Sequence, residues 1–432
     1  MNLIVEHAPS LRGTVSVPGD KSITHRALML GALGEGSSRI DGFLDGGDCR
    51  ATIGCMEALG ALIERRGEEH LVVHGSGLHG WRKPAAPLDC QRSGTTMRLL
   101  AGLLAGQTFS SRLDGASQLI RRPMDRIIIP LKAMGADISG RESDRLPPLD
   151  IAESTLHDVD YALPMASAQV KSAILLAGLY AKGMTRVTEP GPSRDHTERM
   201  LRARGVSVES HYPTHTLSGP ATRLEAIDVS IPGDFSSAAY FVVAACLVPG
   251  SEIVLHNIGI NPTRTGLLDV LHSMTADIEM LDTHDEGGEP VADLAIRGCQ
   301  LTPADVSGEI VPRMIDEFPI LALAATQAHG TTVVRDAAEL RVKETDRIAT
   351  IVSELRALGA HIEGHPDGFI IEGPTPLTGA TVDSHKDHRL AMTLAIAGLV
   401  AGGETTIRDA ECMDDSFPGF MERLHTLEGA AL

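Results

Sequence analysis

The chain has 432 residues, of which 43% are hydrophobic and only 3% are aromatic. This length is typical of two domains, whose cores must be filled mainly by Leu, Val, Ile, Ala and Met. The formal net charge of −19 argues against nucleic acid or an anionic membrane as the main partner. A small anionic ligand is still compatible with this charge if Lys and Arg are gathered locally.

The N-terminus and the cysteines give no sign of export. Residues 1–7 lack a basic stretch followed by a long apolar one, and no apolar run approaches the roughly 18–20 residues of a membrane span. The six cysteines form no CxxC and no metal-like cluster, which favours buried free thiols in a reducing compartment. We therefore expect a cytoplasmic protein without membrane contact.

The first landmark along the chain is the segment 17–22, Val-Pro-Gly-Asp-Lys-Ser, which returns as Ile-Pro-Gly-Asp-Phe-Ser at 231–236. An apolar run that ends in glycine follows each copy. Lys21 and Arg26 of the first copy are replaced by Phe235 and Tyr240 in the second. The scaffold is therefore duplicated, whereas the charged residues of the first copy invite a functional interpretation.

A finer repeat lies beneath the duplication. A helix end, a glycine or small residue and a strand start recur together from residues 56, 131, 201, 271, 355 and, in a worn copy, 424. Glycine can adopt a positive φ there, which lets the chain turn directly into a strand. The sequence therefore predicts six α/β units of about 70 residues.

The six units divide into three and three. We predict one domain over residues 20–232 and a second over residues 1–19 plus 233–432, with crossings at Pro18-Gly19 and Pro232-Gly233 that can act as a hinge. The alternative is that both Pro-Gly pairs are ordinary turns.

Several local signals predict helix starts and strand pairs. A helix is expected from near Ser22, Asp48 is a candidate cap, and Pro123 suits a first helical turn. Asp195 and Glu198 have capping-box spacing. Strand pairs are expected around the turns at 66–68 and 365–368.

Cations and hydrogen-bond donors gather at predicted helix starts in the first half. Lys21, Ser22 and Arg26 could form an anion site, because a helix N-terminus offers amide donors and a positive dipole end. The segment 92–98 is rich in donors around Gly94, which would allow close approach to the backbone. Arg121 and Arg122, and then Ser167, Gln169 and Arg194, lie at further helix starts. For each site taken alone, an ordinary cap or a solvated helix end is the alternative.

The second half adds carboxylates. Asp316 precedes a very apolar helix and is either a cap or a general base. The segment 341–347 alternates charges, which also suits a salt-bridged surface, and the segment 387–389 opens another apolar helix. An acidic protein with cations at helix starts in two hinged domains suggests a clamp on small polyanions.

These segments, in this order, closely resemble the 5-enolpyruvylshikimate-3-phosphate synthases (3-phosphoshikimate 1-carboxyvinyltransferases) of the enolpyruvyl transferase family. The resemblance runs nearly end to end and rests on six motifs: Pro-Gly-Asp-Lys-Ser-x-x-x-Arg, Ser-Gly-Thr-Thr-Met-Arg, Arg-Pro-Met, Ser-Ala-Gln-x-Lys, Arg-Val-Lys-Glu-Thr-Asp-Arg and Asp-His-Arg-x-Ala-Met. It implies an inside-out α/β barrel of two domains, each with three βαβαββ units. It also implies a monomer that uses no metal or organic cofactor.

The resemblance implies transfer of the enolpyruvyl group of phosphoenolpyruvate to the 5-hydroxyl of shikimate 3-phosphate, in the shikimate pathway to the aromatic amino acids. Asp316 and Glu344 would be the proton-transfer residues, assisted by Lys21. The shikimate 3-phosphate residues implied are Lys21, Ser22, Arg26, Ser167, Gln169, Arg194, Asp316 and Lys343. Those implied for phosphoenolpyruvate are Lys21, Gly94, Arg122, Gln169, Arg347 and Arg389.

Two positions depart from the family pattern. Arg92 stands where many relatives have Asn, and Asp415 stands where some have a phosphoenolpyruvate-binding Lys, so another cation such as Lys386 would have to substitute. The resemblance also implies sensitivity to glyphosate. A related transferase that acts on UDP-N-acetylglucosamine is the nearest alternative, but the segment 114–121 lacks the cysteine that it carries there. A non-catalytic anion-binding α/β protein is the third possibility.

Overall fold

A computed structural model describes residues 2–428 of the chain. The chain divides into two compact units. Unit 1 contains the segment up to Pro18, Pro232–Asp285 and the segment from Pro290 onward, and unit 2 contains Gly19–Ile231 and Glu286–Glu289. The hinge expected at the two Pro-Gly pairs concerns motion between the units and stays a prediction.

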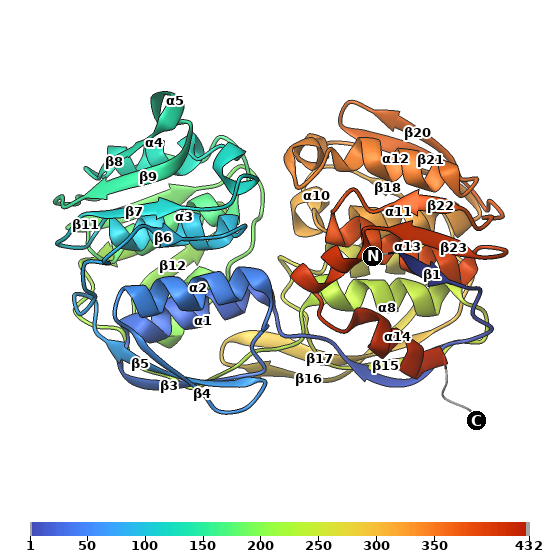
Figure 1. The fold of residues 1–432 in the computed structure, drawn as a ribbon, viewed down its shortest axis with the longest axis horizontal. Coiled ribbons are helices and arrows are strands. Elements are labelled where there is room, and N and C mark those ends of the chain that lie inside the picture. Colours follow the sequence, from blue (N-terminus) through green and yellow to red (C-terminus); the bar gives the residue numbers. More distant parts are fainter. Residues whose placement is uncertain (1, 429–432) are drawn as a thin grey trace. The chain divides into compact units, whose positions relative to one another are not determined.

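Unit 2 holds three four-stranded sheets with the orders β14-β3-β5-β4, β6-β7-β9-β8 and β10-β11-β13-β12 (Figure 1). Their strands are β3 (Glu35–Asp41), β4 (Leu62–Arg65), β5 (His70–Ser76), β6 (Leu88–Asp89), β7 (Ser111–Asp114), β8 (Asp137–Gly140), β9 (Leu146–Ala152), β10 (Asp160–Ala162), β11 (Gly183–Thr188), β12 (Val208–His211), β13 (Thr214–Gly219) and β14 (Val229–Ser230). Its helices are α1 (Lys21–Leu33), α2 (Gly47–Ala58), α3 (Gly94–Leu104), α4 (Asp125–Ala133), α5 (Arg141–Asp144), α6 (Ala168–Gly178) and α7 (His196–Ala203).

The described residues of unit 1 also form three sheets, with the orders β16-β17-β15-β2, β18-β19-β21-β20 and β1-β23-β22. Their strands are β1 (Leu3–Val5), β2 (Arg12–Ser16), β15 (Glu252–Gly259), β16 (Asp277–Glu286), β17 (Glu289–Arg297), β18 (Asp305–Val306), β19 (Gly330–Val334), β20 (His361–His365), β21 (Gly368–Gly373), β22 (Thr381–Asp383) and β23 (Thr405–Arg408). Its helices are α8 (Phe235–Leu247), α9 (Gly266–Ser273), α10 (Ile310–Arg313), α11 (Phe318–Gln327), α12 (Arg347–Ala357), α13 (His388–Val400) and α14 (Phe420–Glu428).

All six sheets share one plan. A short strand pairs in parallel with a central strand, as β6 does with β7 and β18 with β19. The other side of the central strand pairs antiparallel, as in β7 with β9 and β19 with β21. The expected mixed α/β fold of six repeated units is therefore confirmed.

The sixth sheet explains why the last sequence repeat looks worn. Its central strand β23 pairs in parallel with β22, and β1 from the start of the chain supplies its antiparallel neighbour, with Leu3 opposite Ile407. Within residues 2–428 this sheet has three strands, and the hairpin that completes the other five sheets is not found there. The N-terminal strand thus closes the repeat within unit 1.

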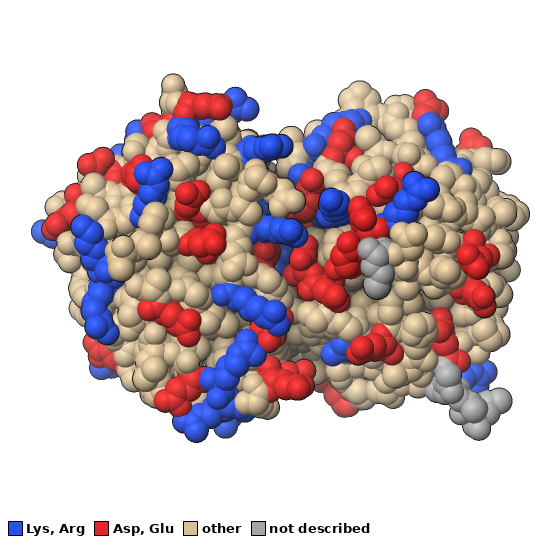
Figure 2. Space-filling model, in the orientation of Figure 1, with Lys and Arg blue, Asp and Glu red and all other residues tan. Residues whose placement is uncertain are grey.

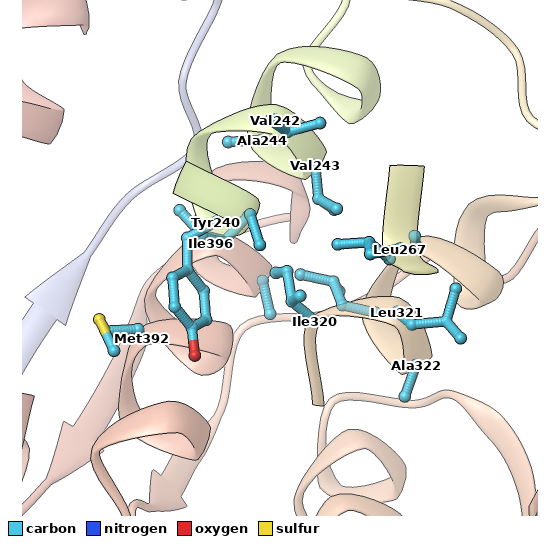
Figure 3. Packing of buried hydrophobic residues seen from close by; sticks show 14 of the residues in the cluster. Tyr240, Val242, Val243, Ala244, Leu267, Ile320, Leu321, Ala322, Met392 and Ile396 are labelled. Carbon is cyan, nitrogen blue, oxygen red and sulfur yellow. The ribbon is translucent and has the colours of Figure 1, made fainter. Parts of the chain in front are cut away.

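Each unit has a core of buried helices. In unit 2, α1, α3 and α6 are almost wholly buried, which accounts for their apolar composition all round. In unit 1, α8, α11 and α13 play this part, and Figure 3 shows Val243, Leu321 and Met392 among the packed side chains. Phe241, Phe417 and Phe420 pack against one another in one cluster through tilted and edge-to-face ring contacts.

Some predicted boundaries are wrong. Helix α2 begins before Asp48 with Gly46 as its cap, so Asp48 lies in the first turn. Helix α4 begins at Asp125, which leaves Pro123 outside it, because a 3₁₀ turn at Leu119–Arg121 precedes it. Glu198 does not complete a capping box on α7, since its carboxylate contacts Lys171 instead.

Other local predictions are confirmed. The turns at 66–68 and 365–368 connect the antiparallel pairs β4–β5 and β20–β21. The cysteines in the described part of the chain are free thiols.

None of the helices within residues 2–428 is long and apolar enough to cross a membrane. On the face drawn in Figure 2, basic and acidic side chains are interspersed over each unit.

Candidate functional site

The first cluster of unit 2 begins at the N-terminus of α1. Asp20 caps this helix by accepting a hydrogen bond from the Ile23 amide at 2.9 Å, so the helix starts at Lys21. The ammonium of Lys21 lies 3.3 Å from Asp48, and both side chains are only partly exposed. Ser22 follows in the first turn, as the anion site predicted from the sequence requires.

Arg26 lies one turn further along α1 and is buried. Its guanidinium donates to Thr197 at 2.6 Å, to Ser172 at 2.8 Å and to the Ser22 carbonyl oxygen at 2.9 Å. Burial lowers the pKa of Arg26 to about 10, while the charge of Glu198 raises it. These three hydrogen-bond partners carry no charge, so they do not neutralise the guanidinium.

Gly94 and Arg122, predicted together from the sequence, are neighbours in space. A Cβ atom added at Gly94 would lie 3.3 Å from Nη1 of Arg122 and 2.9 Å from Nη1 of Arg98. Gly94 is the first residue of α3, after the cap Ser93, so the start of this helix faces two guanidiniums. A cradle of backbone amides and two cations suits a small anion.

Arg98 is a residue of this cluster to which the sequence assigned no role. Its Nη1 donates to Oε1 of Gln169 at 2.6 Å, and Nε2 of Gln169 donates to Thr95 at 2.9 Å. Arg98 therefore joins α3 to the start of α6. Its position four residues after Gly94, one helical turn along, was the available signal.

Ser167 and Arg194 occupy the two remaining predicted positions in unit 2. Ser167 is the cap residue of α6, but its hydroxyl makes no capping hydrogen bond. Arg194 lies in the loop between β11 and α7, and its charge is one of those that lower the pKa of Arg26, after burial and against Glu198 and Asp20. Both side chains are partly exposed.

The cluster of unit 1 is centred on Arg347, the first residue of α12. This buried guanidinium contacts three carboxylates: Asp387 at 2.7 Å, Glu344 at 2.7 Å and Asp316 at 3.4 Å. Burial alone would lower the pKa of Arg347, but the charges of Asp387 and Glu344 outweigh it and raise that pKa.

Asp316 lies between two guanidiniums. One of its oxygens is 3.4 Å from Arg347 and the other is 3.4 Å from Arg389, the second residue of α13. Although burial opposes it, the charge of Asp316 helps to raise the pKa of Arg389. Asp316 is 16% exposed, so a ligand can still reach a carboxylate that two cations hold in place.

The segment 341–347 is both a salt-bridged surface and part of the cluster. Arg341 pairs with Asp346 at 2.7 Å, and Lys343 pairs with Glu339 at 3.3 Å, as the surface interpretation predicts. Glu344 instead contacts the buried Arg347 and is one-third exposed. Only the second part of this segment therefore contributes a carboxylate to the cluster.

The second copy of the Pro-Gly-Asp segment is filled by the protein itself. Ser236, which corresponds to Ser22, donates its hydroxyl to Glu317, and Arg264 contacts Asp234 at 2.8 Å and Ser236 at 2.9 Å. Glu317 is buried, next to Asp316. A carboxylate of the chain thus occupies this helix start, so the repeat keeps the architecture without an open anion site.

The two departures noted in the sequence lie on loops and 3₁₀ segments. Lys386 has φ +59° and is exposed just before α13, and its amide donates to Ser384 at 3.1 Å. Asp415 ends the 3₁₀ segment Ala410–Asp415. Arg92 is exposed before α3. That Lys386 substitutes for the missing lysine stays a prediction.

Within residues 2–428 no group of three metal-ligating side chains is found.

The repeated fold, with cations and carboxylates at helix starts in each unit, defines an α/β protein suited to small polyanions. A family model described as EPSP synthase (3-phosphoshikimate 1-carboxyvinyltransferase) matches residues 5–424. The chain therefore belongs to the EPSP synthase family.

Individual relatives agree with the family model over nearly their whole length. The chain is 50% identical to a 3-phosphoshikimate 1-carboxyvinyltransferase of Desulforamulus reducens, covering 98% of this chain and 99% of the relative. It is 52% identical to the enzyme of that name from Geobacter sp. strain M21, covering 98% of each. A solved EPSP synthase from Acinetobacter baumannii superimposes with a TM-score of 0.90 at 43% identity, covering 99% of this chain and 98% of that one.

Proposed function

We propose that the protein transfers the enolpyruvyl group of phosphoenolpyruvate to the 5-hydroxyl of shikimate 3-phosphate and releases phosphate. Family membership supports the activity. The observation that carries it is the pair of carboxylates, Asp316 and Glu344, on the one buried guanidinium of Arg347. Carboxylates repel anions, so a site that only binds anions would gain nothing from them, whereas proton transfer requires such groups.

Shikimate 3-phosphate is assigned chiefly to unit 2. Arg26 carries a buried charge whose partners are neutral, and Lys21 stands at the same helix start, so a phosphate would find both charge and amide donors there. Arg194 adds a third cation, and Ser22, Ser167 and Gln169 supply neutral donors for hydroxyl and carboxylate groups. From unit 1, Asp316 and Lys343 complete the proposed set.

Phosphoenolpyruvate is assigned to the cradle at Gly94 with Arg122, and to Arg347 and Arg389. Guanidiniums bind carboxylate and phosphate through two parallel hydrogen bonds. The open backbone of Gly94 admits the ligand beside Arg122. Lys21 and Gln169 are proposed to touch both substrates.

The chemistry balances with these residues. Asp316 takes the proton of the 5-hydroxyl while Glu344 donates a proton to the methylene carbon of phosphoenolpyruvate. The hydroxyl oxygen attacks the adjacent carbon and forms a tetrahedral intermediate. Glu344, now a carboxylate, takes back a proton from the new methyl group, and phosphate leaves the central carbon with the proton that Asp316 held. The double bond and the starting protonation of both carboxyl groups are thereby restored. The cations offset the charge that develops on the phosphate.

Arg347 offers a reason for the timing of this proton donation. Its Nη2 donates to Glu344 at 2.7 Å. An anionic group of phosphoenolpyruvate that binds Arg347 would replace Glu344 as a partner. Beside a second anion, the carboxyl of Glu344 would bind a proton more readily. Substrate binding would thereby prepare the acid.

We further propose that the protein acts as a cytoplasmic monomer that uses no metal or organic cofactor. The chemistry needs only proton transfers and charge stabilisation, which the side chains named above supply.

The test is release of inorganic phosphate from phosphoenolpyruvate by the full chain. We expect release that requires shikimate 3-phosphate and yields one equivalent of enolpyruvyl product. Release that requires UDP-N-acetylglucosamine instead would identify the related transferase. Binding of both phosphorylated ligands without any release would leave a non-catalytic protein and refute the proposal.

A further inference from the structure

A buried group of charged residues lies in the core of unit 2, close enough to Arg26 for one of its carboxylates to influence that guanidinium. The ammonium of Lys171, in α6, is completely buried and lies 3.0 Å from Glu189 and 2.9 Å from Glu198. His215 of β13 contacts the same two carboxylates, at 3.0 Å and 3.4 Å. No substrate role falls on any of these four residues. Charges buried at this depth are expensive unless they are paired.

Lys171 connects two segments that carry proposed ligand residues, the start of α6 and the loop 189–195. Its own helix α6 begins with the segment of Ser167 and Gln169. Its ammonium also donates to the carbonyl oxygen of Ser193 at 3.3 Å, in the loop 189–195 that presents Arg194. Glu189 is the first residue of this loop, and its carboxylate accepts a hydrogen bond from the Ser193 hydroxyl at 2.5 Å. This bond connects the two ends of the loop.

The next residue of α6 continues the connection to Arg26. Ser172 accepts from Arg26 at 2.8 Å and lies 2.7 Å from Thr197, which accepts from Arg26 as well. Thr197 precedes Glu198 in α7, so two adjacent residues of α6 meet two adjacent residues of α7. One pair is ionic and the other is built from hydroxyls.

The pKa shifts of Lys171 and Arg26 also connect this buried group to the proposed site. Burial would lower the pKa of Lys171, but the charges of Glu198 and Glu189 outweigh it and raise that pKa, so the ammonium stays charged. Glu198 is also the charge that most raises the pKa of Arg26, against the larger effect of burial. The negative charge of Glu198 therefore acts on both Lys171 and Arg26.

We propose that Lys171 is a positioning residue for the shikimate 3-phosphate site. From the core of unit 2 it holds the loop 189–195 and helix α7 in place, so that Arg194 and Arg26 can bind the same phosphate. The inference rests on the proposed function for the identity of the ligand. Lys171 touches no substrate itself. It acts by holding the backbone of Ser193 and the carboxylate of Glu198 in place.

The test uses a pair of variants that separates position from charge. Lys171→Met alone leaves two buried carboxylates without this cation, which is strongly destabilising and makes the single variant unsuitable as a test. The double variant Lys171→Met/Glu198→Gln removes one positive and one negative charge, so the net charge of the cluster is unchanged. Glu198→Gln alone is the matched reference, because Lys171 still holds Ser193 in it. Lys182→Met, an exposed lysine of the same unit, is the control for substitution itself.

Relative to Glu198→Gln, we expect the double variant to raise KM for shikimate 3-phosphate by at least about tenfold, with KM for phosphoenolpyruvate and kcat within about threefold. Amide hydrogen exchange over residues 189–195 should speed up in the double variant, while Lys182→Met matches the wild type. An unchanged KM for shikimate 3-phosphate in a folded double variant overturns the proposal. An equal rise in both KM values does so too, since it would signal a general loss of structure.

Failure of the proposed function is distinguishable from failure of this inference. If the wild type releases no phosphate with both substrates, the proposed function fails while the exchange measurement still decides whether Lys171 holds the loop. If the wild type is active and exchange over 189–195 is unaffected in the double variant, the positioning role is refuted.

Discussion

Arg26 of unit 2 and Arg347 of unit 1 are both buried guanidiniums near the start of a helix, but their partners differ in kind. Arg26 donates to hydroxyl and carbonyl oxygens, whereas Arg347 contacts carboxylates. Burial lowers the pKa of Arg26 to about 10, and the neighbouring carboxylates outweigh burial to raise the pKa of Arg347. The hydrogen-bond partners of Arg26 are neutral, whereas Arg347 contacts three carboxylates.

This difference in partners suggests how one repeated scaffold could provide a binding site in unit 2 and proton-transfer groups in unit 1. Under the proposed function, neutral partners would orient Arg26 without neutralising it, which would leave its charge for a phosphate. Charged partners would make Arg347 a support for Asp316 and Glu344, the proposed proton-transfer residues. The predictions below test whether the unit 1 cluster is indeed chemical and the unit 2 cluster is indeed for binding.

The largest effect should follow removal of Asp316. Asp316→Ala takes away the proposed base, so we expect kcat to fall by about 10²–10⁴-fold. KM for phosphoenolpyruvate should stay level or decrease, because Arg347 and Arg389 both lose a competing carboxylate. Steady-state kinetics check this, with Asp305→Ala as a control for an exposed ion pair. Weaker binding at unchanged turnover would assign Asp316 to binding.

Glu344→Gln should give a comparable but smaller loss. The amide keeps the size of the side chain and can still accept from Arg347, so the fold and the affinity for substrates are preserved. It cannot donate an acidic proton, and we expect kcat to fall by about 10²–10³-fold. Single-turnover experiments would locate the loss in the chemical step. Wild-type turnover in this variant would transfer the acid role to another group.

Arg26→Lys tests the binding side of the comparison. Lysine keeps the charge but not the planar set of donors that reaches Thr197, Ser172 and the Ser22 carbonyl together. We expect KM for shikimate 3-phosphate to rise by about 10–100-fold and kcat to change far less. Calorimetric titration with shikimate 3-phosphate provides the direct measurement. A loss confined to kcat would mean that unit 2 also takes part in the chemistry.

The sequence predicted the repeat and the members of the clusters because both depend on local signals. Glycine after a helix, Pro-Gly-Asp before one, and short motifs at helix starts identify themselves without tertiary information. Gly94 and Arg122 are such cases, and the structure brings them together. The count of six units also follows from local helix ends, although the closing strand β1 comes from the other end of the chain.

The rest depends on contacts between elements distant in sequence. Arg98 acquires a role only where Gln169, 71 residues away, meets it. Glu198 has capping-box spacing, yet its carboxylate contacts Lys171 because the buried cation competes more strongly for it than a helix amide. No local pattern shows that Glu317 fills the helix start at Ser236. Tertiary packing decides which of two locally acceptable partners a polar group takes.

Gly94→Ala should alter the phosphoenolpyruvate side more mildly. The added methyl group would meet the guanidinium ends of Arg98 and Arg122, which are flexible enough to shift without unfolding the helix. We expect KM for phosphoenolpyruvate to rise several-fold and inhibition by glyphosate to weaken more, since a longer inhibitor has less room. Inhibition constants for the two proteins check this. An unchanged constant would place the inhibitor away from Gly94.

The smallest effect is expected at Arg204, a buried cation that shares one property with Arg26. Burial lowers the pKa of Arg204 to about 10 as well, and its guanidinium donates to the Met200 carbonyl oxygen at 3.4 Å. Both the lowered value and the ordinary value lie above pH 7, so the guanidinium is charged in the folded and the unfolded chain and the cost of burying it is present at neutral pH. Arg204→Met removes that cost.

We therefore expect urea unfolding of Arg204→Met at pH 7 to show an unchanged free energy or a gain of up to about 2 kcal/mol, with kcat and both KM values as in the wild type. Burial would then be insufficient to mark a ligand-binding cation: Arg26 would differ from Arg204 by its ordered hydroxyl partners and by the neighbouring charge of Arg194. A raised KM for shikimate 3-phosphate in this variant would contradict that distinction, because it would make any buried guanidinium of unit 2 part of the site.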